Sequence, residues 1–203
     1  CKITIGGSWD GDIVTLSHTD EDRKSIDSAV AVARGADVIV LALGGNEQTS
    51  REGWSKTHLG DRASLELIGM QNELAKAMVE TRKPVVVLLF HGRPNSIEYI
   101  HTHVHAILEC WYIGQETGRA VAEVLFGDYN PGGKLPISIP RSVGHIPCYY
   151  NHKPSARRGY LFDDVSALYP FGYGLSYTTF VFSNLRLEKS IIRVDETTTV
   201  LVD

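Results

Sequence analysis

Three short apolar runs interrupt an otherwise mixed sequence, at 37–43 (DVIVLAL), 84–90 (PVVVLLF) and 104–111 (VHAILECW). The first two runs are nearly continuous rather than alternating, and glycine or histidine follows them, which is typical of strands buried on both faces. Between the runs, apolar residues recur at helical spacing. The predicted helices are at 22–36, 64–82, 95–100 and 114–127.

The alternation of helix and strand predicts an α/β fold, with a mostly parallel sheet between helices on both faces. In such sheets, ligands bind outside the carboxyl ends of the strands. Three segments follow predicted strands directly and are therefore the places to search for a site. They are the glycine-rich stretch 44–62, the turn 91–94 (HGRP) and the segment 112–116 (YIGQE).

From Asp128 onward the pattern changes, because Pro, Gly and Tyr become frequent and helical periodicity ends. We interpret this part as a long segment that wraps the sheet. Beyond it, FVFSNLRLEK and ETTTVLVD alternate apolar and polar residues. They are predicted to be two strands of an antiparallel module that ends before it could build a core.

Composition narrows the function classes. The 203 residues include 43% hydrophobic and 22% charged residues with a net charge of -4, which is ordinary for a soluble globular protein. The scattered basic residues give no indication of a nucleic-acid partner or of a charged membrane surface. The apolar runs are too short to cross a bilayer. Three widely spaced cysteines form no CxxC motif, and a start without Met suggests a chain cut from a longer precursor.

Several candidate sites favour structural interpretations. GGNEQ lacks the lysine of a phosphate-binding loop, and HTHVHAILEC (101–110) more readily forms a polar turn with hydrogen-bonded histidines than a metal site. Arg93, at a strand end, is expected to order a neighbouring loop, with substrate contact as the alternative. Glu116 is expected to cap a helix.

The stretch 44–62 is the strongest candidate for chemistry because it combines two glutamates, Glu47 and Glu52, with an aromatic side chain, Trp54. A tryptophan beside a carboxyl group suits sugar binding, since the indole face stacks on a pyranose ring and the carboxyl can protonate a glycosidic oxygen. The residues alone leave either glutamate open. They also leave open a solvated loop in which Asp61 caps a helix beginning near Ser64.

Taken together, four segments resemble the C-terminal domain of glycoside hydrolase family 3, the β-glucosidase and β-xylosidase family. The similarity covers nearly the whole chain and lies in these segments, in this order: ADVIVLALGGNEQTSREGW…LGDRASLELIGMQNEL, PVVVLLFHGRP, WYIGQETGRAVAEVLFGDYNPGGKLPISIP and LYPFGYGLSYTTF.

The resemblance implies a flavodoxin-like α/β sandwich over residues 1–175, truncated at its start. The beginning of a fibronectin type III-like domain would follow at 176–203. An absent N-terminal barrel would supply the sugar-binding subsite and an aspartate nucleophile. The partners are therefore that barrel and a β-glucoside or related oligosaccharide. No metal or organic cofactor is implied. A secreted or periplasmic location is a family expectation that no signal in this chain carries.

SREGW…GDR is similar to the family's acid/base motif, which selects Glu52 as the catalytic acid/base of a retaining β-glycosidase, most often a β-glucosidase. Trp54 and Arg51 are then expected at the sugar. Four residues are expected to be structural near the site: Glu47, Asp61, Arg62 and Arg93. Without its barrel the chain should be inactive. The alternative is a non-catalytic α/β module that binds carbohydrate or a partner.

Overall fold

A computed structural model describes residues 20–53, 60–153 and 159–203. Its centre is a parallel sheet in the order β1-β2-β3, formed by β1 (Ile39–Gly44), β2 (Val85–Phe90) and β3 (Ala106–Glu109). Ile39 aligns with Val85, and Val86 aligns with Ala106. The carboxyl ends of all three strands therefore meet at one edge of the sheet, which confirms the predicted parallel α/β class.

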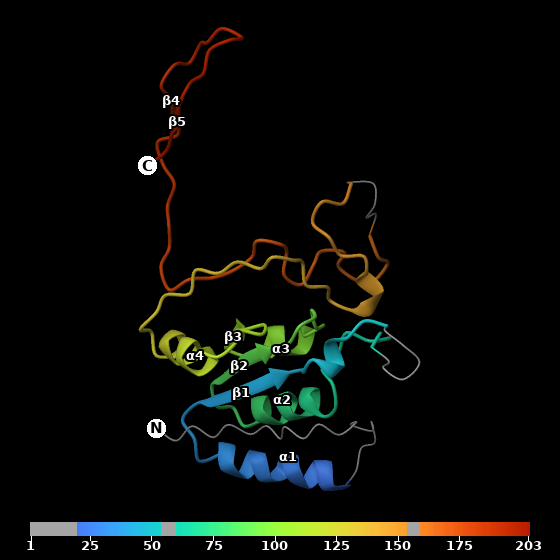
Figure 1. The fold of residues 1–203 in the computed structure, drawn as a ribbon. Helices are drawn as coiled ribbons and strands as arrows, with labels where there is room; N and C mark the ends of the chain where they lie inside the picture. Colours follow the sequence, from blue (N-terminus) through green and yellow to red (C-terminus); the bar gives the residue numbers. More distant parts are fainter. Residues whose placement is uncertain (1–19, 54–59, 154–158) are drawn as a thin grey trace.

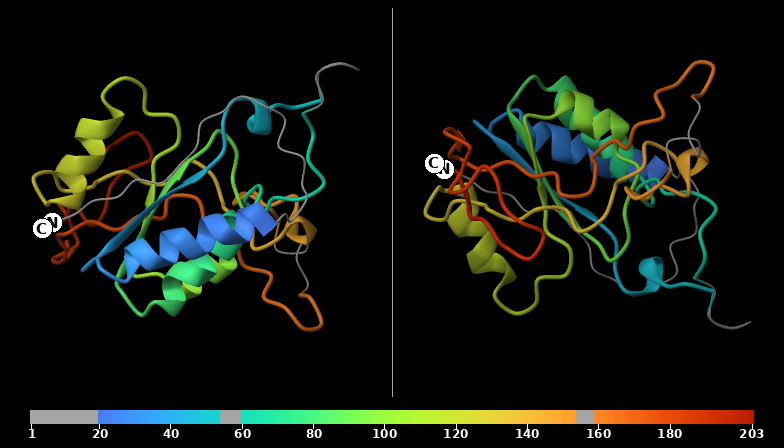
Figure 2. Two further views of the ribbon diagram at one scale, coloured as in Figure 1. Left: turned by 90° about the horizontal axis from the view of Figure 1, so that it is seen from below. Right: turned by 90° about the horizontal axis from the view of Figure 1, so that it is seen from above.

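Four helices flank this sheet. They are α1 (Asp20–Ala33), α2 (Gln71–Glu80), α3 (Glu98–His103) and α4 (Thr117–Leu125). The helices α1 and α2 lie on one face and α4 on the other, as two perpendicular views agree (Figure 1, Figure 2). Helices therefore cover both faces, as the sequence predicts.

The core lies between the sheet and α2. Val85, Val87 and Leu89 of β2 are at most 1% exposed, and they pack with Ala75 and Met78 of α2. Full burial of one aliphatic side chain of this size contributes about 1.5–3 kcal/mol. This central strand therefore anchors the edge at which the loops meet.

The helix predicted at 64–82 begins only at Gln71, so its first turns were wrongly predicted. The carbonyl oxygen of Leu65 accepts hydrogen bonds from Asn95 Nδ2 (3.0 Å) and Ser96 N (2.9 Å) instead of from a helical neighbour. Gly69, with a φ of 60°, then takes a left-handed conformation that interrupts any helix. Long-range contacts thus override the local apolar periodicity of 64–70.

The segment after α4 wraps the sandwich as predicted. Ile139 N donates to Tyr169 O at 2.8 Å, and Leu168 is buried in the main core. The described residues include two single-turn 3-10 helices, η1 (Gln48–Ser50) and η2 (Val143–His145).

At the C-terminus, β4 (Arg186–Leu187) and β5 (Val200–Leu201) pair antiparallel. The ribbon that they form extends away from the sandwich (Figure 1), with Phe180 and Phe182 exposed beside it. Antiparallel pairing matches the expected module. The fibronectin-like identity of 176–203 and the boundary at 175 stay predictions.

Candidate active site

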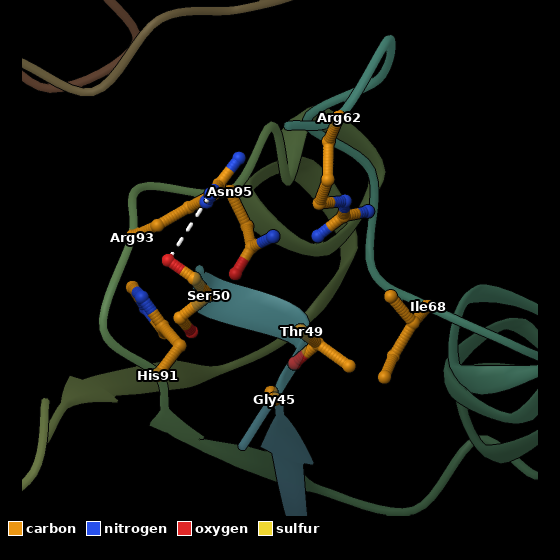
Figure 3. Close-up of a pocket in the computed structure, with 9 residues that line it drawn as sticks. Gly45, Thr49, Ser50, Arg62, Ile68, His91, Arg93 and Asn95 are labelled. Carbon is orange, nitrogen blue, oxygen red and sulfur yellow. Dashed lines mark hydrogen bonds between the residues drawn. The ribbon is translucent and has the colours of Figure 1, made fainter. Parts of the chain in front are cut away.

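The three segments that follow the strands come together at the carboxyl edge of the sheet. Loop 45–62 follows β1, the turn 91–95 follows β2, and residues 110–112 follow β3. Side chains from the first two segments line a small pocket (Figure 3). Its lining residues are Gly44, Gly45, Thr49, Ser50, Arg62, Ile68, His91, Arg93 and Asn95. The cavity volume of about 10 Å³ is room for about one water-sized group.

The first turn of loop 45–62 is fixed by its own polar residues. Asn46 Oδ1 accepts a hydrogen bond from Thr49 N at 3.1 Å, and Thr49 Oγ1 accepts one from Asn46 N at 2.9 Å. This reciprocal pairing satisfies the free backbone donors of a short turn, which explains η1. At the strand end, the Gln71 side chain bonds both Gly44 N (2.7 Å) and Gly44 O (2.8 Å).

Arg93 joins the turn after β2 to the middle of the loop. Its Nη2 donates to the carbonyl oxygen of Ser50 at 3.1 Å and also to that of Arg51. The side chain is 15% exposed. Such charge-assisted bonds are roughly twice as strong as neutral ones. These bonds tie the loop to the turn after β2, whereas the role of Arg93 near a site stays a prediction.

Glu52 stands directly after the two carbonyl groups that Arg93 binds. Its carboxylate is 93% exposed and its Oε1 lies 4.0 Å from Arg93 Nη2. The side chain therefore projects outward from a fixed backbone, next to a buried positive charge. This position at the strand edge suits a group that acts on something outside the domain.

Glu47 and Arg51 form a pair of their own. Arg51 Nε and Nη2 donate to the two carboxylate oxygens of Glu47, each at 2.8 Å. This hydrogen-bonded pairing raises the pKa of Arg51. Glu47 thus has the loop-ordering contacts expected of it, whereas the predicted contact of Arg51 with substrate stays a prediction.

Asp61 closes the base of the loop instead of capping a helix. Its Oδ1 accepts a hydrogen bond from Gly53 N, and no helix begins near Ser64, so the capping alternative was wrong. Gly60 packs against the backbone of Glu52, so closely that a Cβ there would overlap the carbonyl oxygen of Glu52. Trp54 lies outside the described residues, so its expected place at the sugar stays a prediction.

Arg62 enters the pocket from the far end of the loop. Its Nη2 donates to the carbonyl oxygen of Glu66. Burial, and then the positive charge of Arg93, lower the pKa of Arg62. The two guanidinium groups are therefore close enough to repel each other, a relation that sequence spacing does not reveal.

A buried pair that includes the lining residue His91 was missed by the sequence analysis. His91 is 2% exposed, and its Nε2 lies 2.9 Å and 3.1 Å from the two carboxylate oxygens of Glu109, at the end of β3. The ring also packs 5.0 Å from Trp111. The available signal was positional, since both polar residues stand at ends of adjacent predicted strands.

Tyr112 adds a third link between the segments that was also missed. Its hydroxyl lies 2.9 Å from Ser50 Oγ, which in turn accepts a hydrogen bond from Gly92 N at 3.4 Å. One serine thus contacts the segments after β2 and β3 together.

The three histidines of the HTHVH stretch form hydrogen bonds with other protein groups. His101 Nδ1 bonds the Tyr169 hydroxyl (2.6 Å), His103 Nδ1 donates to Tyr99 O (2.8 Å), and His105 Nδ1 accepts from Val85 N (3.2 Å). The described residues contain no cluster of three or more His, Cys, Asp or Glu that could hold a metal. Glu116 is the N-cap residue of α4, the expected place at the helix start, although its side chain makes no capping hydrogen bond.

Comparison with known proteins identifies a family for this chain. A model of the glycosyl hydrolase family 3 C-terminal domain matches residues 7–177. The chain is 45% identical over 185 residues to a β-xylosidase of Formosa agariphila, covering 89% of this chain and 25% of that protein. It is 43% identical over 189 residues to a periplasmic β-glucosidase of Salmonella typhimurium, covering 88% and 24%.

Solved structures agree. A β-glucosidase from Erythrobacter marinus superposes with a TM-score of 0.83 at 45% identity, covering 94% of this chain and 26% of that one. A β-glucosidase from Listeria innocua in complex with glucose gives a TM-score of 0.71 at 35% identity, covering 85% and 24%. The chain thus spans about a quarter of the length of these relatives. Among the helices of the described residues, none has the length and apolar character that a membrane span requires.

Proposed function

Because the chain belongs to glycosyl hydrolase family 3, as the family's C-terminal domain, we propose that it supplies the proton donor of a retaining β-glycosidase. The proton donor is Glu52. The observation that carries this proposal is the outward-facing Glu52 carboxylate at the carboxyl edge of a parallel sheet, 4.0 Å from Arg93.

In the proposed reaction, Glu52 protonates the glycosidic oxygen while an aspartate from an N-terminal barrel attacks the anomeric carbon. Glu52 then removes a proton from water, which releases the sugar from the aspartate. The two carboxyl groups of a retaining pair lie about 5–5.5 Å apart. The other carboxylates of the loop have structural contacts, Glu47 with Arg51 and Asp61 with Gly53. The nucleophile is therefore proposed to come from outside the domain.

The small size of the pocket supports a second surface that would face Glu52. Ligand pockets usually enclose about 300–1,000 Å³, whereas the pocket beside Glu52 has room for about one water-sized group. A sugar bound at Glu52 would thus need a facing surface. We assign that surface to the barrel.

The proposed substrates are terminal β-D-glucosyl residues, because three of the four proteins compared are β-glucosidases. β-D-xylosides are the related candidates, given the Formosa relative. A periplasmic or secreted location is proposed by analogy with the Salmonella protein. Residues 1–175 are proposed as the sandwich and 176–203 as the start of a fibronectin type III-like domain.

The test is Glu52→Gln in the full-length protein that contains this chain. General acid catalysis contributes about 10²–10⁴-fold, so cellobiose turnover should fall by that order. A dinitrophenyl glucoside, whose leaving group needs no proton, should still be cleaved at the first step, and azide should accelerate its turnover.

Two matched variants sharpen the result. Glu80→Gln, on the exposed end of α2, should leave both substrates unaffected. Glu47→Gln should show no azide effect, because Glu47 orders the loop through Arg51. Normal cellobiose turnover by Glu52→Gln, or azide rescue of Glu47→Gln, would contradict the assignment.

A further inference from the structure

Two guanidinium groups line the pocket behind Glu52, and no carboxylate of the described residues forms an ion pair with either of them at less than 4.0 Å. The guanidinium groups of Arg62 and Arg93 both line it (Figure 3). Among the described residues, the carboxylate that pairs with Arg93 is that of the exposed Glu52, at a distance of 4.0 Å. Arg62 forms no ion pair within the described part of the chain, and its Nη2 donates to a backbone carbonyl group. Two part-buried like charges are costly unless an opposite charge lies between them.

Two buried nitrogen atoms of the same lining lack hydrogen-bond partners among the described residues. They are Nε of Arg93 and Nδ1 of His91. The His91 side chain is only 3% exposed, and Glu109 occupies its other nitrogen. Buried polar atoms in folded proteins are nearly always hydrogen-bonded, so unpartnered nitrogens in a pocket mark a place for a bound water molecule or ion.

We propose that this pocket binds one small monovalent anion of the halide or carboxylate class, held between Arg62, Arg93 and His91. The cavity volume of about 10 Å³ admits one halide ion or one oxygen of a carboxylate. Arg62 and the unpartnered Nε–H of Arg93 donate to the anion. His91 Nδ1 belongs to the lining of the same cavity.

Such an anion would connect two segments that carry the site. Arg62 ends loop 45–62, whereas His91 and Arg93 belong to the turn after β2. Arg93 also holds the backbone just before Glu52. Bound anion would therefore stabilise the loop that presents Glu52. This role is separate from proton transfer.

The experiment measures binding to the whole chain, without hydrolysis. Sodium bromide, sodium acetate and sodium glucuronate are each titrated at constant ionic strength, with sodium HEPES as the bulky non-binding anion. Bromide or acetate is expected to raise the unfolding temperature saturably. Bromide or acetate binding with no glucuronate binding identifies a free anion as the occupant. Glucuronate binding that exceeds acetate binding identifies a carboxylate carried by a sugar.

Three variants test the location. Arg62→Gln should weaken binding about tenfold or more, because a charge-assisted hydrogen bond is lost. Arg119→Gln, an exposed arginine on α4 paired with Glu123, should bind like the parent. Glu52→Gln should also retain binding, so failure of the proposed catalytic role and failure of this inference give different results.

Bromide soaked into a crystal of the parent chain tests the proposal without requiring that any variant folds. Anomalous scattering should place one bromide between Arg62, Arg93 and His91. A response without saturation, equal binding by Arg62→Gln, or a pocket that holds only water would overturn the proposal.

Discussion

The hydrogen bonds of Arg93 should contribute measurably to the stability of the chain. Arg93→Met removes the guanidinium group but keeps much of the aliphatic volume. The variant loses two charge-assisted bonds, to the carbonyl groups of Ser50 and Arg51. Each such bond is worth about 1.5–3 kcal/mol. Because both carbonyl groups belong to part-exposed residues and can bond water instead, we expect a net loss of about 2–4 kcal/mol.

The assay is urea unfolding followed by circular dichroism. With a slope of about 2 kcal/mol per molar urea, the midpoint should fall by roughly 1–2 M. Hydrogen exchange measured by mass spectrometry should also become faster in residues 46–53, because the loop loses its anchor.

Arg119→Met is the matched control, since it removes an arginine whose only described partner is a carboxylate one helical turn away. Exposed pairs of this kind contribute little, so its unfolding midpoint should equal that of the parent. An unchanged midpoint and unchanged exchange in Arg93→Met would refute the reasoning. An equal loss in Arg119→Met would do the same.

Two further predictions concern the sheet edge. Gln71→Leu should lower the free energy of unfolding by about 2–3 kcal/mol, because the substitution removes both hydrogen bonds to Gly44 and leaves the part-buried N–H of Gly44 without a partner. An unchanged urea midpoint would count against this prediction. Burial, and then the charge of Glu109, raise the pKa of the Cys110 thiol to about 11. The thiolate is the reactive form, so iodoacetamide should modify Cys110 slowly at pH 8 and faster as the pH approaches 11. Mass spectrometry should find the part-exposed Cys148 modified first, and the opposite order would contradict this.

The strands and the class of the fold were predictable because their signal is local. The continuous apolar runs at 37–43 and 84–90 match β1 and β2 to within two residues at each end. A strand buried on both faces needs such a run, whatever else surrounds it. The same holds for α1 and α4, whose apolar spacing and flanking glycines give boundaries within three residues.

The start of α2 was not predictable, because its limit depends on residues distant in sequence. Apolar spacing from 64 onward fits a helix, yet the carbonyl group of Leu65 is bound by Asn95, thirty residues away. No pattern in the local sequence reports that competition. The local sequence also does not show that Asp61 binds Gly53, because an aspartate that caps a helix and one that closes a loop look the same in the sequence.

The residues of the candidate site were likewise predictable only in part. Glu52 was selected by resemblance to a motif, and Arg93 by its position after a strand, and both lie at the expected edge. The pair of His91 and Glu109 depends on the register between two parallel strands. A single sequence shows which residues end the strands but does not show which of their side chains meet.

The closed base of loop 45–62 has a consequence for how the protein can change. Asp61 holds Gly53 on one side, and Gly60 lies against Glu52 on the other. Since the two ends are already held together, extra residues inserted between them cost only a slowly growing entropy, about 0.6 kcal/mol for each doubling of length. Insertions between Gly53 and Gly60 are therefore expected to preserve the backbone position of Glu52. The loop base thus permits variation in length and sequence between Gly53 and Gly60 without a change in the backbone position of Glu52.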